Sequence, residues 1–335
     1  MTHDLIEPSS TRWAMVPATP VAAILALAVP LLIPPLVDTV PGDDLRAEAV
    51  VLDRPLPTDV PQAVIVLAGY RSSYAGTAPA DDRVERFSYR GLGPDGTPLP
   101  YRPQDTTISV ADSVRLLDEQ VKRLHRRTGR PIALIGESEG AMVARSYLEQ
   151  GAHPAVDTLA MFSPLINAGR AYYPPPHEDR GWGLVTGWQL RLVFGVIRLV
   201  GGPDTGPDEP FIRSLVDDAP FYRNQLMCPV PGIRMLAFIP TTTAAEAPPG
   251  EYSRIPFFQM PGVHGGLLNR TLVADRLIAF LTGEPIQQER DEYPLLQRLS
   301  AAWQAPPLPI GANPAWSQFR QPDPAFTGKV CQPAD

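Results

Sequence analysis

The chain has 335 residues, 44% of them hydrophobic and 19% charged, which suits one large α/β domain or two small ones and excludes a wholly disordered protein. Proline is frequent, at 41 residues, but no Gly-X-Y period is present, so the chain is not collagen-like. The net charge of −7 and the lack of a basic cluster beyond residues 122–130 argue against a nucleic-acid partner.

The amino-terminal segment is strongly apolar, and residues 13–37 carry no charged side chain. Such a run is long enough to cross a bilayer core of about 30 Å. Because residues 37–41 form a poor cleavage site, we expect residues 1–40 to be an uncleaved membrane anchor rather than a signal peptide. The alternative is a leader that packs on the surface or is disordered. Arg12 before the run and Asp43 after it favour an extracytoplasmic domain, either membrane-anchored or secreted.

Short apolar runs alternate with amphipathic segments through the rest of the chain. The apolar runs predict strands over residues 61–69, 83–89, 131–136, 156–162, 232–239 and 255–260. Amphipathic periodicity and capping residues predict helices over residues 107–128, 139–150 and 267–281. Strands that alternate with helices pair in parallel, so we expect an α/β fold with a mostly parallel sheet flanked by helices.

The alternation suggests three parts after the anchor. We expect an α/β domain over residues 41–285 and a proline-rich extension over residues 286–335. An insertion at about residues 167–228 interrupts the domain. Within it, residues 182–200 are apolar but contain two arginines, which predicts an amphipathic helix that packs on the domain or forms a lid over an apolar pocket.

Two cysteines, Cys228 and Cys331, are too few for a disulfide framework or a cysteine-rich metal site. Export of the chain would allow a single bridge between them, and two unpaired thiols are the equal alternative. The sequence leaves both alternatives open.

The segment Gly136-Glu-Ser138-Glu-Gly140 follows an apolar strand and opens a helix, which is the setting of a G-x-S-x-G nucleophile elbow. Both glycines are needed because strand and helix approach closely around a strained turn. A serine hydroxyl needs a base at neutral pH. Among five histidines, His264 follows the last predicted strand, in the chain order Ser, acid, His.

The elbow and the Val263-His-Gly-Gly266 loop resemble those of the α/β-hydrolase superfamily, in its serine esterase/lipase branch, over about residues 49–282. The resemblance implies an α/β-hydrolase fold with a helical lid or cap insertion. It also implies an oxyanion hole made by the N–H groups of Tyr70, after the first strand, and Glu139, after the nucleophile. The chain departs from the family pattern in the triad acid, since no Asp follows the strand over residues 232–239. Glu246 is the first candidate and Glu251 the second.

The resemblance therefore implies a serine hydrolase that cleaves carboxylic esters, including lipid esters, through an acyl-enzyme. Ser138 is the expected nucleophile, His264 the base and Glu246 the acid. No cofactor and no metal are implied, and the expected partners are an ester or lipid substrate and a membrane. An acyltransferase or thioesterase on the same triad is one alternative, and a non-catalytic membrane-tethered binding protein is another. Glu137 and Glu139 either crowd the nucleophile with negative charge or point to solvent.

Overall fold

The structure is a computed structural model that describes part of the chain. The described residues are 55–150, 153–166, 199, 209–218, 221–222, 225–240, 253–260, 267–286 and 331. The predicted anchor over residues 1–40, most of the insertion and most of the carboxyl-terminal extension lie outside this set. Among the described residues, no helix is both long enough and apolar enough to cross a membrane.

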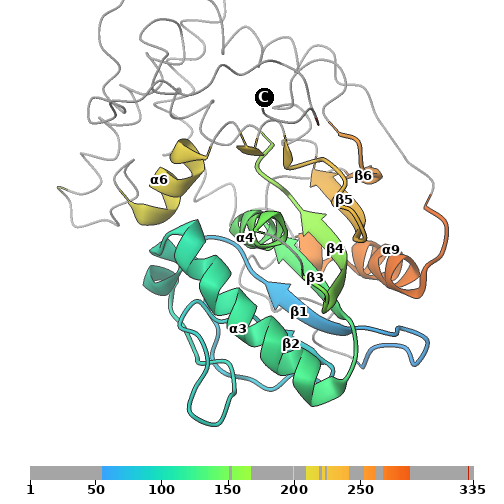
Figure 1. Ribbon diagram of the computed structural model, residues 1–335, viewed down its shortest axis with the longest axis horizontal. Helices are drawn as coiled ribbons and strands as arrows, with labels where there is room; N and C mark the ends of the chain where they lie inside the picture. The colour runs from blue at the N-terminus through green and yellow to red at the C-terminus, as the bar shows by residue number, and fades with distance from the viewer. Residues whose placement is uncertain are drawn as a thin grey trace, which may run out of the picture.

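Six parallel strands form one sheet, in the order β2-β1-β3-β4-β5-β6 (Figure 1). The strands are β1 (Ala63–Leu67), β2 (Val84–Arg86), β3 (Ile132–Glu137), β4 (Val156–Phe162), β5 (Arg234–Pro240) and β6 (Phe257–Met260). The parallel α/β fold predicted from the sequence is confirmed.

The helices cover both faces of this sheet. They are α3 (Val110–Thr128), α4 (Glu139–Glu149), α6 (Pro210–Asp217) and α9 (Thr271–Thr282), with 3-10 turns η2 (Pro103–Thr107) and η3 (Leu267–Asn269). Along β1, Ile65 and Leu67 face a core shared with α3, α4 and α6, whereas Val64 and Val66 face a core shared with α9. This alternation is the side-chain period of a strand, and it leaves β1 buried on both faces.

One strand and one helix are shorter in the structure than the sequence predicts. The predicted strand over residues 83–89 is ordered as β2 only to Arg86, because Ser88 then donates its hydroxyl to the carbonyl of Leu99 at 2.6 Å and draws the chain into a loop. The helix predicted from residue 107 begins at Val110, because the Ser109 hydroxyl accepts from the N–H of Asp112 at 3.0 Å and caps the helix there.

Two further differences concern the second half of the chain. The helix predicted over residues 267–281 is two elements, η3 and α9, separated at Arg270, whose backbone is extended. Helix α6 was not predicted from the sequence. It lies in the predicted cap, for which the structure otherwise describes Leu199, Glu209 and a few residues before β5.

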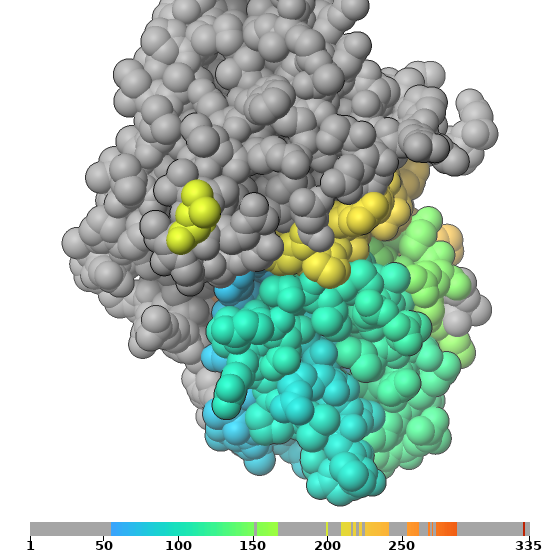
Figure 2. All heavy atoms as spheres, turned by 90° about the vertical axis from the view of Figure 1, so that its left-hand side faces the viewer, coloured from blue at the N-terminus to red at the C-terminus, as the bar shows by residue number. Residues whose placement is uncertain are grey.

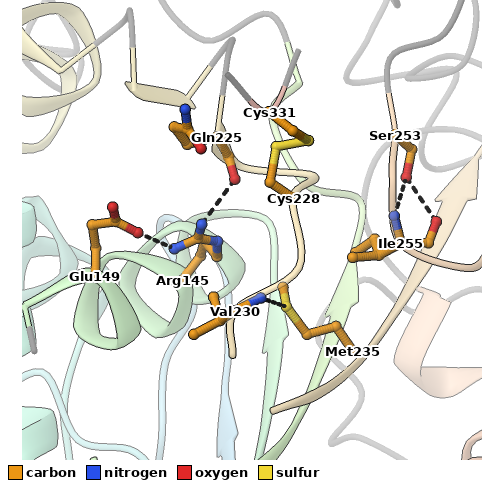
Figure 3. The surroundings of a disulfide bond; sticks show 9 residues. All are labelled: Arg145, Glu149, Gln225, Cys228, Val230, Met235, Ser253, Ile255 and Cys331. Carbon is orange, nitrogen blue, oxygen red and sulfur yellow. Dashed lines mark hydrogen bonds and ion pairs between the residues drawn. A yellow bond between two sulfur atoms is a disulfide. The ribbon is translucent and has the colours of Figure 1, made fainter. Parts of the chain in front are cut away.

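A disulfide joins Cys228 to Cys331, so the pairing that the sequence left open is present in the structure (Figure 3). The segment before Cys228 is hydrogen-bonded to α4. Arg145 of α4 is buried, and its guanidinium donates to the carboxylate of Glu149 at 2.7 Å and to the backbone carbonyl of Gln225 at 2.9 Å (Figure 3). The carboxyl-terminal extension is therefore linked covalently to a segment that packs on the helix after the elbow.

Candidate active site

Ser138 occupies a sharp turn between the central strand β3 and helix α4. Its backbone has φ 53° and ψ −114°, a region that residues with a side chain rarely adopt. The Ser138 N–H donates to the carbonyl of Phe162 on β4 at 2.8 Å, so the neighbouring strand holds the turn. Strain of this kind persists only where surrounding structure enforces it, and it concentrates at functional sites.

The two glycines of the motif allow this turn to form. A Cβ on Gly136 would lie 2.4 Å from the carbonyl oxygen of Gly140, and a Cβ on Gly140 would lie 2.2 Å from the carbonyl oxygen of Leu67. Real Cβ atoms do not approach backbone atoms so closely. The packing of β3, α4 and β1 around Ser138 therefore requires glycine at both positions, as the motif predicts.

The loop after β1 lies directly beside the serine. A Cβ on Gly69 would lie 3.1 Å from the Cβ of Ser138 and 3.7 Å from its Oγ. Arg71, two residues later, has a φ of 59°, and its N–H donates to the hydroxyl of Thr106 at 2.9 Å. Among the described residues, the N–H of Tyr70 has no hydrogen-bond acceptor.

The second predicted oxyanion donor, Glu139, is the first residue of α4. Its N–H belongs to the opening turn of the helix, where no intrahelical acceptor exists and where the helix dipole favours a bound negative charge. The structure thus brings the predicted nucleophile and both predicted oxyanion residues to the carboxyl-terminal edge of the sheet.

The carboxyl group of Glu139 is buried inside the protein. The residue has 0% exposure, and among the residues that the structure describes neither of its carboxyl oxygens has a hydrogen-bond partner. Burial and the nearby Glu209 raise the pKa of Glu139 well above its ordinary value, with a smaller opposing effect from Tyr89. The orientation that the sequence left open is thereby settled for Glu139, whose side chain is buried and does not point to solvent.

Glu137, on the other side of the serine, is half-buried and serves a different purpose. Its Oε1 accepts a hydrogen bond from the backbone N–H of Leu267 at 3.0 Å. Leu267 begins η3, which follows the loop after β6. The contact joins the elbow to the part of the chain in which the predicted base is found.

The predicted base and both candidate acids lie outside the described residues: His264, Glu246 and Glu251. No group of three or more metal-ligating side chains occurs in the part of the chain that the structure describes. Sequence reasoning missed Glu209, whose carboxyl oxygen accepts from the Tyr70 hydroxyl at 2.5 Å. No signal in the sequence marks it, because it lies 139 residues after Tyr70.

The strand order, the parallel pairing and the strained serine between a central strand and the next helix together define a known architecture. The chain has the α/β-hydrolase fold. The fold prediction drawn from the elbow and the histidine loop is confirmed.

No family model matches the sequence, and no curated protein matches it. Solved structures do match at low identity. The thioesterase RedJ from the prodiginine pathway of Streptomyces coelicolor is 22% identical, with 71% of this chain and 95% of that chain covered and a TM-score of 0.34. The phospholipase PlaB from Legionella pneumophila is 14% identical, with 72% and 63% covered and a TM-score of 0.42. A soluble variant of monoglyceride lipase from Saccharomyces cerevisiae is 11% identical, with 71% and 96% covered and a TM-score of 0.38.

Proposed function

We propose that this α/β-hydrolase is a serine hydrolase that cleaves carboxylic esters, including lipid esters, through an acyl-enzyme. The observation that carries the proposal is the strained turn at Ser138, held beside the Gly69–Tyr70 loop. A serine in this conformation exposes its Oγ at the sheet edge, next to two backbone N–H groups that have no acceptor in regular structure.

The proposed reaction uses Ser138, His264 and the two oxyanion residues. The Ser138 Oγ attacks the acyl carbon while His264 takes the hydroxyl proton. The N–H groups of Tyr70 and Glu139 bind the oxyanion of the tetrahedral intermediate. His264 then gives its proton to the leaving alcohol, and a water molecule attacks the acyl-enzyme by the same route to release the acid.

The assignment of His264 as the base is supported by its sequence distance from an anchored residue. Leu267 is hydrogen-bonded to Glu137, the residue before the nucleophile. Leu267 comes three residues after His264 in the sequence, and three residues span at most about 11 Å when fully extended, which is compatible with a base that acts on Ser138. Glu246 is the proposed acid, with Glu251 as the second candidate.

The first experiment is labelling with a fluorophosphonate probe, followed by assays on p-nitrophenyl esters of short and long acyl chains. The wild-type protein should be labelled and active, and Ser138→Ala should lose both properties. Ser146→Ala, which changes a serine farther along α4, is the matched control and should retain both. An unlabelled wild-type protein, or normal turnover by Ser138→Ala, would overturn the proposal.

The triad members are tested with the same substrates. His264→Ala should lower kcat by at least about 10³-fold, the scale of loss seen when a triad member is removed. Comparing Glu246→Gln with Glu251→Gln should give a large loss in the first variant and a small one in the second. The reverse result would reassign the acid. Adding alcohol acceptors and analysing products distinguishes hydrolysis from acyl transfer.

We further propose that the catalytic domain is extracytoplasmic, either anchored by residues 1–40 or secreted. The uncharged segment over residues 13–37 supports this location, and so does the Cys228–Cys331 disulfide, since such bonds persist in oxidising compartments. Protease treatment of intact cells should digest the domain, and thiol alkylation before reduction should find no free cysteine. Protection from protease together with two free thiols would contradict the location.

A further inference from the structure

Glu209 stands immediately before α6, within the predicted insertion at about residues 167–228. Its side chain is directed into the protein, and the residue is only 8% exposed. One carboxyl oxygen accepts the hydrogen bond from the Tyr70 hydroxyl, with 2.5 Å between the two oxygens. A residue from the insertion region therefore contacts the side chain of a predicted oxyanion-hole residue.

The ring of Tyr70 is held on further sides. It stacks on the ring of Phe211, with 5.3 Å between centroids and 22° between planes. The guanidinium of Arg71 lies 5.4 Å from the Tyr70 centroid. Burial and the hydrogen bond to Glu209 raise the pKa of Tyr70 above its ordinary value, so the phenol remains a proton donor to that carboxyl group. A tyrosine side chain has few rotatable bonds, and these contacts fix them.

Helix α6, which carries Phe211 and follows Glu209, is itself held by contacts with the domain. It packs against α3 and η2, and Val110 at the start of α3 donates its N–H to the hydroxyl of Ser214 on α6 at 3.1 Å. Figure 2 shows the yellow surface that includes α6 directly against the blue-green surface that includes α3. Glu209 and Phe211 are thereby held in place by the domain core.

Glu209 also acts on Glu139, the second predicted donor. Its carboxyl group adds to the larger effect of burial in raising the pKa of the Glu139 carboxyl group. One side chain therefore contacts the first of the two predicted oxyanion residues and acts electrostatically on the second, although it belongs to neither the elbow nor the loop after β1.

We propose that Glu209 is a positioning residue for the oxyanion hole, which holds Tyr70 so that its N–H points at the same place as the N–H of Glu139. This inference rests on the proposed serine hydrolase function. The hydrogen bond to the Tyr70 hydroxyl holds the ring in one position. Because the ring is joined to the backbone through Cβ and Cα, it also holds the Cα of Tyr70, and the Tyr70 N–H bond keeps its direction. Glu209 touches neither the substrate nor the reacting atoms in this scheme.

The test compares Tyr70→Phe, which removes only the hydroxyl, with Glu209→Ala and Glu209→Gln. Loss of a whole oxyanion donor costs about 10²–10³ in kcat, so a misaimed donor should cost at least about tenfold. We expect that loss in Tyr70→Phe and in Glu209→Ala, with KM changed by no more than about twofold. Glu209→Gln keeps an acceptor oxygen and should restore kcat to within about threefold of wild type.

The double variant Tyr70→Phe/Glu209→Ala should be no slower than either single variant, because both remove one and the same interaction. Two matched controls should keep the wild-type kcat. Tyr147→Phe removes a hydroxyl that makes only a 3.5 Å contact with Asp118. Asp217→Ala removes an exposed carboxylate at the far end of α6.

Fluorophosphonate labelling of the wild-type protein separates the two proposals. If Ser138 is not labelled, the proposed function fails before any variant is compared. If Ser138 is labelled and Tyr70→Phe and Glu209→Ala keep the wild-type kcat, the positioning role is overturned and the hydrolase proposal stands. Additive losses in the double variant, or a loss confined to KM, would also overturn the positioning role.

Discussion

The Oε1 atom of Glu137 accepts a hydrogen bond from the backbone N–H of Leu267, with 3.0 Å between the atoms. The contact spans 130 residues of sequence and joins the residue before Ser138 to the residue three places after His264. It is a direct link between the nucleophile elbow and the chain that carries the proposed base.

The first prediction follows from this link. Glu137→Ala should lower kcat/KM about three- to tenfold, since a net hydrogen bond is worth about 0.5–1.5 kcal/mol and its loss frees the end of the histidine loop. Glu137→Gln keeps an acceptor oxygen, so its kcat/KM should stay close to that of wild type. Ester hydrolysis over a range of pH measures the effect. Glu119→Ala, on an exposed face of α3, is the control. Equal rates for Glu137→Ala and wild type would show that the contact does not position the loop.

The second prediction concerns the buried acid Glu139. Its pKa is raised in the folded protein, first by burial and then by Glu209, so the folded state binds this proton more tightly than the unfolded state. Between the unfolded pKa, near 4.5, and the raised folded pKa, stability should therefore fall as pH rises.

Urea unfolding at pH 5 and pH 8 tests this linkage. Glu139→Gln cannot ionise, so its free energy of unfolding should fall less between the two pH values than that of wild type. Tyr89 and Glu209 are the titratable groups that act on Glu139, and neither is changed in the comparison. Parallel pH dependence in the two proteins would mean that Glu139 does not titrate as its burial requires.

The third prediction concerns close packing at the elbow. Gly140→Ala would place a Cβ 2.2 Å from the Leu67 carbonyl oxygen, which cannot yield without moving β1. We expect a loss of about 3 kcal/mol in the free energy of unfolding, at the upper end of overpacking effects. Gly93→Ala is a milder control, since its nearest neighbour is the side chain of Asp95. In thermal denaturation, Gly140→Ala should have a lower Tm than Gly93→Ala, and the Tm of Gly93→Ala should be close to that of wild type.

The fourth prediction concerns the disulfide. Cys331→Ser should lower the free energy of unfolding by about 2–4 kcal/mol, because the bond closes a loop of about a hundred residues in the unfolded chain. Thermal denaturation with and without reductant provides the measurement. Wild type should lose stability on reduction, and Cys331→Ser should be indifferent to reductant. A reductant effect of the same size in both proteins would exclude the Cys228–Cys331 bond as its source.

Much of the fold could be predicted from the sequence because it depends on local patterns. Apolar runs marked the strands, and the glycines around Ser138 marked the strained turn, since each depends on neighbours within a few residues. The helix start at Ser109 could have been recognised in the same way, because a serine three residues before an aspartate is an N-cap pattern.

The supporting contacts of the site could not be predicted in this way. The burial of Glu139 contradicts the usual preference of glutamate for solvent, and no local pattern in the sequence predicts it. Glu209 contacts Tyr70 because α6 packs on α3. The apolar pattern of α6 covers too few residues to predict a helix from the sequence. Contacts between residues more than a hundred positions apart are set by the tertiary fold.

The bond between Cys228 and Cys331 also changes what a break in the backbone would do. Both candidate acids and His264 lie in the sequence between these cysteines. After a single proteolytic cut anywhere from residue 229 to residue 330, the two fragments would stay attached through sulfur, and they would migrate as separate bands only once a reducing agent was added. A nicked molecule could thus keep its histidine loop tethered to the domain that bears the nucleophile.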